Sequence, residues 1–443
     1  MNEFGMWSKN ISFTDGKLHL SGIPVSQLAK DFGTPAFFLD EDDFRIRALG
    51  WKSALTEEFG AHTGNVFYAA KAFISVEVAK WIQEIGIGID VCSGGELSVA
   101  LAGGIDPEKI EVHGNNKSLD EIDRAVHVGV KAIVVDSLQE IDRVAAMARK
   151  YKKTQQIFLR LTPGIQAHTH ESISTAHEDV KFGFSIASGA AWLAVEEAAK
   201  HPELELRGIH CHVGSQIFGT ESFELAAERL IAFLAKYRDA FGSQLPELDL
   251  GGGYGIAYLP EDETVQPGDV IPALGNAVRK FCQLYALDLP LISIEPGRAI
   301  VGPSMFTLYE VGTTKDVVLE DGKIRRYISI DGGMSDNIRP SLYDAEYHAI
   351  LAGRESTAPF ISSRIVGKHC ETGDIVIKSI DLPSDISPGD LIAVPATGAY
   401  GRSMASNYNH IPRPPVVAVK GSQARVILRR ENNEDLLALD VKE

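Results

Sequence analysis

Eight short apolar runs, each followed by a longer segment of helical periodicity, constrain this chain more than any other feature. They lie at residues 66–69, 88–92, 110–113, 132–135, 157–161, 207–212, 247–250 and 291–294. Between them, spacings of three and four place apolar side chains on one helical face, as in Leu274, Ala277, Val278 and Phe281. Strands that alternate with helices form parallel sheets. Eight such repeats predict an α/β fold, a TIM-type (β/α)8 barrel.

A second, β-rich domain is predicted beyond the barrel. After about residue 305, strands separated by turn residues replace the helical alternation, at residues 306–311, 326–330, 375–377, 391–394, 416–419 and 425–428. The segment I-S-F-T-D-G-K-L-H-L predicts a hairpin around Asp15 and Gly16, which we assign to the same domain. The 443 residues exceed what one core usually organises. We therefore predict N-terminal strands at 1–35 that pack with the β domain, a barrel at 36–304, and a C-terminal β sandwich or barrel at 305–443.

Charge and cysteine content narrow the functional class. The formal net charge of -17 opposes general binding to nucleic acid or anionic membranes. The four cysteines are scattered without a C-x-x-C pair, which fits neither a disulfide framework nor a structural zinc site and favours a reducing cytoplasm. The first 20 residues lack a basic segment followed by an apolar one, and no run of 18 apolar residues occurs. We expect a soluble, unprocessed cytoplasmic protein with a small-molecule partner.

Polar and glycine-rich clusters follow the predicted strands directly, at the barrel face where active sites lie. They are A-K-A-F after the first strand, S-G-G-E after the second, G-N-N-K after the third, V-G-S-Q after the sixth, G-G-G-Y-G after the seventh and E-P-G-R after the eighth. Lys71, in the first cluster, stands where a lysine can be partly desolvated and form a Schiff base. The alternative is an ordinary solvated lysine.

The seventh and eighth strand ends suit an anionic cofactor. The glycines at 251–253 can present backbone N–H groups to a phosphate. The alternative is a tight turn, but their position after the seventh strand, with E-P-G-R after the eighth, favours the phosphate site. Glu295 should point into the barrel mouth, where a buried carboxylate needs a partner. That partner is either Arg298 or the protonated ring nitrogen of a bound cofactor.

Two histidines alternate along the sixth strand. His210 and His212 face one side and Cys211 the other. His212, nearer the carboxyl end of the strand, is better placed to lie against a flat cofactor, whereas His210 is interpreted as a core or second-layer residue. For either, a buried and hydrogen-bonded histidine is the alternative.

A long polar segment follows the fifth strand, from about residue 163 to 181. Its ionisable residues are His168, His170, Glu171, His177, Glu178 and Asp179. Their spacing matches no H-E-x-x-H or similar ligand pattern, so we predict a solvated lid and no metal site.

These motifs together resemble the fold-type III pyridoxal 5'-phosphate (PLP) decarboxylases, with their alanine racemase-like barrel, and among them the bacterial, actinobacterial-like diaminopimelate decarboxylases. The resemblance spans nearly the whole chain. It rests on F-Y-A-A-K-A-F, D-V-C-S-G-G-E-L, H-G-N-N-K-S, H-E-D-V-K-F-G-F, H-C-H-V-G-S-Q, L-D-L-G-G-G-Y-G-I, E-P-G-R, D-G-G-M-S-D-N-I-R-P-S-L-Y, G-K-H-C-E-T-G-D and T-G-A-Y.

The resemblance implies PLP as the cofactor. By it, Lys71 holds PLP as a Schiff base, His212 stacks on the pyridine ring and Glu295 pairs with the ring nitrogen. The other cofactor contacts that it implies come from Ser215, Gly251, Gly252, Gly253, Gly297, Arg298 and Tyr400.

The resemblance also implies a site shared by two subunits. Cys370 matches the proton donor that the family supplies from the neighbouring subunit, and Glu371 would act across the same interface of a homodimer. The residues that hold the far end of the substrate are then Arg298, Arg339, Tyr343, Glu371 and Tyr400.

Charge favours meso-diaminopimelate as the substrate, giving L-lysine and carbon dioxide in the last step of lysine biosynthesis. Its non-reacting end carries an ammonium and a carboxylate, which suit Glu371 and the two arginines Arg298 and Arg339. Ornithine, lysine and arginine lack that carboxylate, so the two arginines disfavour them as substrates. A decarboxylase of one of these amino acids is the alternative. A racemase would place an arginine where Glu295 stands. A regulatory homologue without catalysis would lack Lys71 or Cys370.

Overall fold

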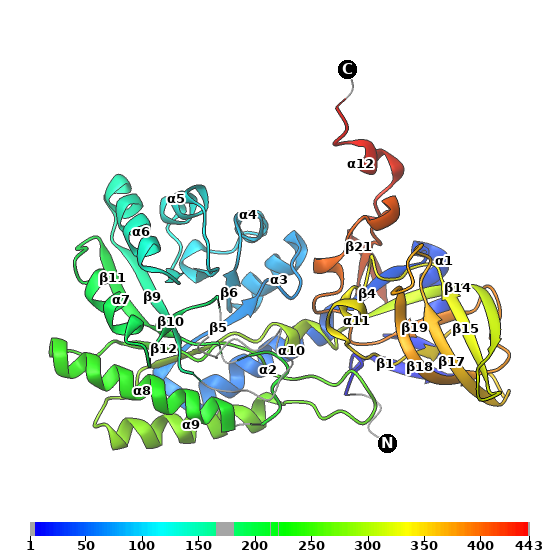
Figure 1. Ribbon diagram of the computed structural model, residues 1–443, viewed down its shortest axis with the longest axis horizontal. Coiled ribbons are helices and arrows are strands. Elements are labelled where there is room, and N and C mark those ends of the chain that lie inside the picture. Colours follow the sequence, from blue (N-terminus) through cyan, green and yellow to red (C-terminus); the bar gives the residue numbers. More distant parts are fainter. Residues whose placement is uncertain (1–4, 165–180, 213, 220, 442–443) are drawn as a thin grey trace. The chain divides into compact units, whose positions relative to one another are not determined.

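The computed structural model describes residues 5–164, 181–212, 214–219 and 221–441, which form two compact units. We call them the barrel unit and the β unit (Figure 1). The barrel unit comprises Arg47–Gly255 and Val265–Ala299. The β unit comprises the described chain up to Ile46, Ile256–Thr264, and everything from Ile300 onward.

The barrel unit is built on eight parallel strands. Their bounds are β5 Thr63–Ala69, β6 Gly88–Val91, β7 Ile110–Val112, β8 Ala132–Val135, β9 Gln155–Thr162, β11 Leu204–His210, β12 Glu247–Asp249 and β13 Leu291–Ile294. Each strand pairs with the next, and β13 pairs with β5, so the sheet closes on itself. A two-residue strand, β10 (Phe184–Ser185), pairs with the end of β9. The predicted eight-stranded barrel is confirmed.

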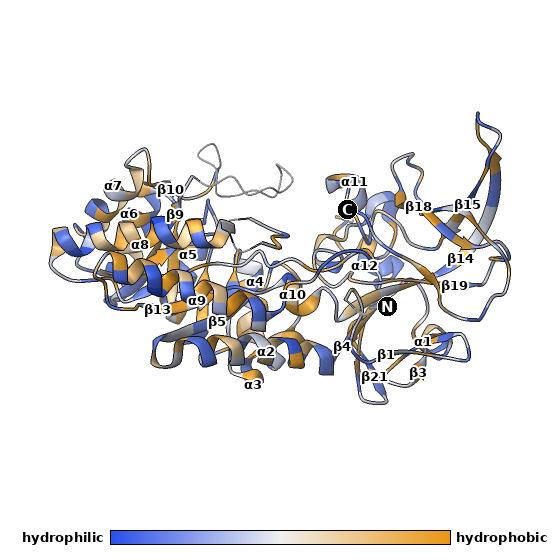
Figure 2. Ribbon diagram, turned by 90° about the horizontal axis from the view of Figure 1, so that it is seen from below, coloured by the Kyte–Doolittle hydropathy of each residue, from blue (hydrophilic) through white to orange (hydrophobic). Residues whose placement is uncertain are grey.

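Helices follow the strands in sequence. They are α2 Glu41–Phe59, α3 Val76–Ile85, α4 Gly94–Ala102, α5 Leu119–Val128, α6 Leu138–Tyr151, α7 Ala190–Ala198, α8 Glu221–Phe241 and α9 Pro267–Leu284. Hydrophilic and hydrophobic patches alternate along α8 and α9 in Figure 2, as expected of helices with one buried face. No helix in the described part of the chain is long and apolar enough to cross a membrane.

Serine caps fix where several of these helices begin. Ser93, Ser118 and Ser137 each accept a hydrogen bond from the backbone N–H three residues later, which belongs to a glutamate in every case. The S-G-G-E cluster is therefore the start of α4. Its Glu96 carboxylate also accepts the N–H of Cys92 at 2.6 Å, which ties the helix to the end of β6.

The interior of the barrel is unusually polar. Bulky branched side chains usually fill such barrels. Here Asp90, Glu111, His210, Asp249 and Glu295 are all at most 3% exposed. Ionisable groups packed this deeply need partners, and their pairing defines the site described below.

The β unit is a mixed sheet that takes in N-terminal strands. The path of the main sheet is β18–β17–β15–β14–β4–β20–β21, and β19 pairs with both β14 and β16. The bounds are β4 Ala36–Asp40, β14 Met305–Val318, β15 Ile324–Ile330, β16 Ile350–Leu351, β17 Phe360–Val366, β18 Ile375–Pro383, β19 Leu391–Val394, β20 Val416–Lys420 and β21 Gln423–Leu428. The α-helices of eight residues or fewer in the described chain are α1 (Val25–Phe32), α10 (Arg298–Val301), α11 (Arg339–Tyr343) and α12 (Asn433–Leu437).

The N-terminal hairpin is confirmed as β1 (Ile11–Thr14) and β2 (Lys17–Leu20), with β3 (Ile23–Pro24) added beside β2. The backbone N–H of Leu18 donates to the carbonyl of Ala352, within the same unit. Strand β4 pairs with β14 and β20. The domain boundaries predicted at residues 35 and 304 stay a prediction. In the structure, residues 36–46 and 256–264 belong to the β unit.

Candidate active site

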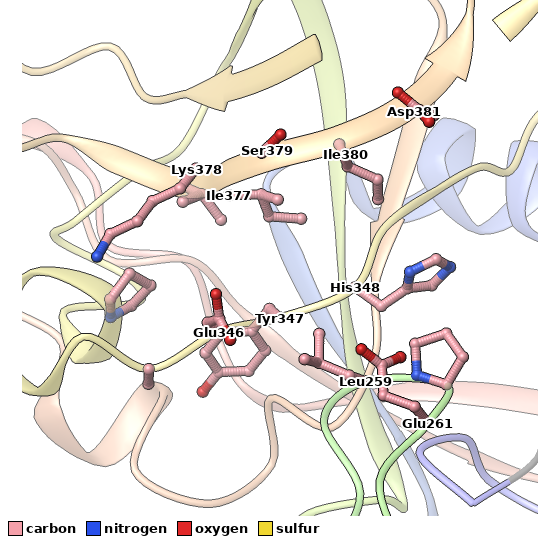
Figure 3. A pocket seen from close by; sticks show the side chains of 14 residues that line it. Leu259, Glu261, Glu346, Tyr347, His348, Ile377, Lys378, Ser379, Ile380 and Asp381 are labelled. Atoms are coloured by element: carbon pink, nitrogen blue, oxygen red, sulfur yellow. The ribbon is translucent and has the colours of Figure 1, made fainter. Parts of the chain in front are cut away.

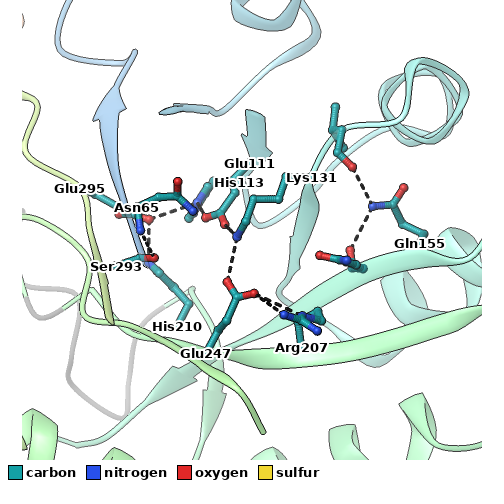
Figure 4. Close-up of polar contacts among 12 residues, drawn as sticks. Asn65, Glu111, His113, Lys131, Gln155, Arg207, His210, Glu247, Ser293 and Glu295 are labelled. Atoms are coloured by element: carbon teal, nitrogen blue, oxygen red, sulfur yellow. Dashed lines mark hydrogen bonds and ion pairs between the residues drawn. The ribbon is translucent and has the colours of Figure 1, made fainter. Parts of the chain in front are cut away.

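Three buried side chains meet where β7, β11 and β13 end. Glu295 directly follows β13, His113 directly follows β7, and His210 is the last residue of β11. The Oε1 atom of Glu295 lies 3.1 Å from Nε2 of His113 and 3.2 Å from Nε2 of His210 (Figure 4). The two imidazole rings meet edge to face, with centroids 4.9 Å apart. One carboxylate oxygen is therefore shared by two histidines.

The surroundings shift the pKa values of the two histidines in opposite directions. Burial lowers the pKa of His210 to about 4, although Glu295 opposes this. Burial also acts against a charge on His113, but Glu295 and Glu111 outweigh it and raise the pKa of that ring. Burial alone would raise the pKa of Glu295, yet His113, His210 and Lys71 together hold it well below its usual range. Glu295 is thus an ionised carboxylate beside His113, whose charged form its neighbours favour, and His210, whose neutral form burial favours.

Lys71 and Asp90 complete a group that we call the barrel-end cluster (Lys71, Asp90, His113, His210 and Glu295). Lys71 is half-buried and lies two residues beyond β5. Burial and the charge of Glu295 raise the pKa of Asp90 to about 7, while Lys71 acts in the opposite direction. The charge of Lys71 lowers the pKa of both carboxylates, so the ammonium acts electrostatically on both.

His212 follows β11 and contacts the loop that follows β12. The backbone N–H of Gly252 donates to Nδ1 of His212 at 3.3 Å. Burial first, and then the charge of Lys71, lowers the pKa of His212 well below its usual value. The ring is therefore neutral and held in orientation by the backbone, as stacking on a flat cofactor requires.

Close backbone packing explains the three glycines at 251–253. Gly251 and Gly253 have φ values of +68° and +104°, which disfavour other residues. A Cβ atom on Gly252 would lie 2.2 Å from the carbonyl oxygen of Glu295. These positions need glycine whether or not a phosphate binds, so phosphate binding here stays a prediction.

Three further predicted residues lie at the same end of the barrel. Arg298 Nη2 donates to Ser215 Oγ at 2.8 Å, which joins the segments after β13 and β11. Arg298 is only 8% exposed. A Cβ atom on Gly297 would lie 2.7 Å from the Cβ of Ala69, the last residue of β5. The structure thus gathers the barrel-unit members of the predicted site around neighbouring strand ends.

Arg339 is the most constrained predicted residue of the β unit. It begins α11 and is 7% exposed. Its guanidinium lies over the rings of Tyr258 and Tyr347, 4.6 and 5.5 Å from their centroids, and donates to the Tyr347 hydroxyl. Within the described residues no carboxylate pairs with it. A buried cation held only by tyrosines favours an anionic ligand.

Cys370 and Glu371 are exposed on a firmly held segment that we call the Cys370 loop (residues 367–374). Buried Asp374 accepts the N–H of Met334 at 2.7 Å and the N–H of His369 at 2.8 Å. Nε2 of His369 accepts a further N–H from Ser335 at 3.1 Å. The loop therefore presents an exposed thiol and carboxylate on a fixed backbone.

Two further predicted residues are half-buried, and one predicted segment lies outside the described chain. Tyr343 ends α11 and is half-buried. Tyr400 is half-buried with a φ of +61°, which is uncommon for a residue with a side chain. The polar lid predicted at 164–181, with its histidines and carboxylates, falls almost entirely on residues outside the described part of the chain.

The β unit also contains a cavity of about 570 Å³. Figure 3 shows Lys378 of β18 on one side of it and Glu261, Tyr347 and His348 on the other. Tyr347 also contacts Arg339, so that tyrosine joins the cavity wall to the guanidinium. In the described chain no predicted site residue lines this cavity.

Sequence reasoning named neither His113 nor Asp90 as a site residue. Both lie within motifs that were recognised, H-G-N-N-K-S and D-V-C-S-G-G-E-L. Each also stands at or next to a strand end, as Glu295 and His212 do. Active-site residues of such barrels lie at the carboxyl ends of the strands, so every ionisable residue at a strand end is a candidate, and His113 and Asp90 meet that criterion.

The barrel end fits PLP. Lys71 offers a half-buried amine, Glu295 a carboxylate that its neighbours keep ionised, and His212 a neutral ring of fixed orientation. The donor atoms of His113, His210 and Glu295 also lie within 4.8 Å of one another, a spacing that could hold a metal ion. Acid–base pairing accounts for that spacing without an ion.

Comparison with known proteins agrees with this fit. Residues 42–302 match the family model for the pyridoxal binding domain of pyridoxal-dependent decarboxylases. The chain is 50% identical to diaminopimelate decarboxylase of Mycobacterium tuberculosis over 442 residues, which covers 99% of this chain and 98% of that one.

Solved structures give the same result. A crystal structure of diaminopimelate decarboxylase from M. jannaschii matches with a TM-score of 0.90 and 29% identity, covering 98% of each chain. The Helicobacter pylori diaminopimelate decarboxylase, complexed with L-lysine, matches with a TM-score of 0.84 and 32% identity, covering 94% of this chain and 98% of that one.

Proposed function

This chain belongs to the diaminopimelate decarboxylase family of PLP-dependent carboxy-lyases, and we propose on that premise that it converts meso-diaminopimelate to L-lysine and carbon dioxide. This is the last step of lysine biosynthesis. The observation that carries the proposal is the buried Glu295, which His113 and His210 keep ionised at a position where a racemase of this fold would have an arginine.

The barrel unit supplies the groups that bind and activate the cofactor. When bound, PLP provides an electron sink for the pair left on the α-carbon after carbon dioxide departs. Lys71 would hold it covalently, and Glu295 would keep its ring nitrogen protonated. His212 would lie against the ring face. The phosphate would contact Ser215, the 251–253 loop and the backbone near Gly297, with Tyr400 close to it.

The β unit supplies the groups that select the substrate. Arg339 is buried, fixed by two tyrosines and without a carboxylate partner in the described chain, so it can accept the distal carboxylate of the substrate without first breaking an ion pair. Arg298 and Tyr343 would share that carboxylate, and Glu371 would take the distal ammonium. A substrate without the carboxylate would leave Arg339 without a counterion.

The carbanion must finally receive a proton, and we assign this to the thiol of Cys370. Cys370 and Glu371 are exposed in this chain, and the rigid loop beneath them keeps both at fixed positions. These features support a homodimer in which the Cys370 loop of one subunit completes the site of the other. All four cysteines are free thiols, which supports a cytoplasmic location.

The direct test is carbon dioxide release by the purified, PLP-loaded protein. Meso-diaminopimelate is the substrate expected to react, and L-lysine, L-ornithine and L-arginine are run in parallel. Release from meso-diaminopimelate alone supports the proposal. Release from one of the other three instead would keep the cofactor and reject the substrate, and no release from any would reject the activity.

A further inference from the structure

A continuous series of buried ion pairs runs through the barrel from Glu295 to the opposite strand ends (Figure 4). Beyond His113 it reaches Glu111 of β7, then Lys131, which directly precedes β8. Lys131 Nζ lies 2.8 Å from Glu111 Oε1 and 2.9 Å from Glu247 Oε2. His113 and Glu295 follow their strands, whereas Lys131 precedes its own, so the series connects the two ends of the barrel.

Lys131 is firmly held in this position. Its ammonium lies 5.2 and 5.0 Å from the ring centroids of Phe67 and Phe158, between the two carboxylates. Burial opposes its charge, but Glu111 and Glu247 outweigh burial and raise the pKa of the ammonium. Lys131 is therefore a permanent cation inside the barrel.

Two carboxylates compete for the same nitrogen of His113. Nε2 of His113 lies 3.1 Å from Glu295 Oε1 and 3.9 Å from Glu111 Oε2. Glu111 uses its other oxygen for Lys131. Because Lys131 neutralises Glu111, His113 can give its closer contact to Glu295. Without that cation, Glu111 would be a buried carboxylate with His113 as its nearest source of positive charge.

We propose that Lys131 is a positioning residue for the cofactor site. By forming an ion pair with Glu111, it leaves His113 free to orient Glu295 and to compensate its charge. This rests on the proposed role of Glu295 at the cofactor ring. In this proposal Lys131 acts through Glu111 and His113. Within the described residues its ammonium contacts Glu111, Glu247 and the rings of Phe67 and Phe158, none of which is a predicted cofactor or substrate residue.

The competition predicts a specific pattern among single and double variants. Lys131→Met should weaken PLP binding by about tenfold, a coupling typical of residues in one ion-pair network. Adding Glu111→Gln removes the competing carboxylate, so the double variant should return to within about twofold of the wild type. Adding Glu247→Gln instead is the matched control, since Glu247 is equally close to Lys131 but is linked to Arg207 rather than to His113.

The readout is the dissociation constant of PLP from the apo protein, with kcat as a second measurement and thermal unfolding to show that each variant is folded. Lys131→Arg, which keeps the charge, should bind PLP like the wild type. Since the first readout is cofactor binding, it stays valid even if the substrate assignment fails, and failure of the wild type to bind PLP would reject the proposed function itself.

Recovery in Lys131→Met/Glu111→Gln, together with continued weakness in Lys131→Met/Glu247→Gln, supports the inference. Unchanged PLP affinity in Lys131→Met would overturn it. So would equal weakness in both double variants, because Lys131 would then act only as a general stabiliser of the barrel.

Discussion

The barrel-end cluster and the Cys370 loop place reactive groups by opposite means. In the cluster, His113, His210 and Glu295 are buried and shift one another's pKa. In the loop, Cys370 is exposed, and the buried groups beneath it hold only the backbone. A buried cluster can tune charge within one chain. An exposed thiol on a rigid support is suited to act on something that arrives from outside, which in our proposal is the site of a second subunit.

Removing the amine of the cluster should have the largest effect. Lys71→Ala should abolish turnover, by more than about 10³-fold, because the covalent attachment of the cofactor needs this amine. The yellow, borohydride-reducible linkage to the protein should also disappear. Lys80→Ala, which changes an exposed lysine of α3, is the control and should behave as wild type. A reducible linkage that persists in Lys71→Ala would place the attachment elsewhere.

Removing the thiol of the loop should separate binding from turnover. Cys370→Ala should bind PLP normally but lose about 10² to 10⁴ in kcat, the usual range for a general acid. Cys282→Ala, a buried thiol of α9, controls for loss of a cysteine and should keep its activity. Near-normal lysine production by Cys370→Ala would remove that thiol as the proton donor.

Loosening the loop should give a smaller loss of the same kind. Asp374→Asn leaves one of the two backbone N–H groups of Met334 and His369 without its acceptor, so the loop should lose its fixed position. We expect kcat to fall about tenfold with PLP affinity and KM little changed. Exposed Asp381 provides the control, Asp381→Asn. A loss of PLP affinity equal to the loss of kcat would show that Asp374 does not act through the loop.

The smallest expected effect is on pH-dependent stability of the apo protein. The pKa of Asp90 is about 7 when folded, above its usual value of 3.8, so the folded state retains a proton that the unfolded state releases. The contribution of neutral Asp90 to the free energy of unfolding is fully present below the unfolded pKa and is lost as the pH rises toward 7. Asp90→Asn carries no such proton.

Between about pH 5 and pH 8, Asp90→Asn should therefore gain stability relative to the wild type, on the order of 2 kcal/mol. Urea unfolding at both pH values measures this difference. Equal pH dependence in the two proteins would show that Asp90 is not held in its neutral form.

The fold was predictable because its main signal is local. Each strand is a short apolar run and each helix a longer segment of helical periodicity, so all eight barrel strands could be predicted from the apolar runs. Strand β4 was not recognised, since its partners β14 and β20 lie more than 260 residues away in the chain. Strand β17 was missed because its sequence F-I-S-S-R-I-V interrupts the apolar run with polar residues.

The candidate site was predictable where a residue type itself suggests chemistry, as for Lys71 and Glu295. The ion-pair network that extends from the site to Lys131 was not predictable from the sequence. Glu111 and Lys131 show no sign in the sequence that they face inward, because a charged residue in or beside a strand is normally solvated. Only barrel closure brings Glu111 of β7 and Glu247 of β12 to the same ammonium.

Mixing Lys71→Ala with Cys370→Ala, each inactive alone, under conditions that exchange subunits tests most directly whether the cluster of one subunit and the Cys370 loop of another form one site. If the site is shared, half of the randomly assorted dimers are hybrids with one complete site, so about a quarter of wild-type activity should return. If hybrid dimers form and no activity returns, the Cys370 loop does not serve the barrel of its partner, and the account of a shared site is contradicted.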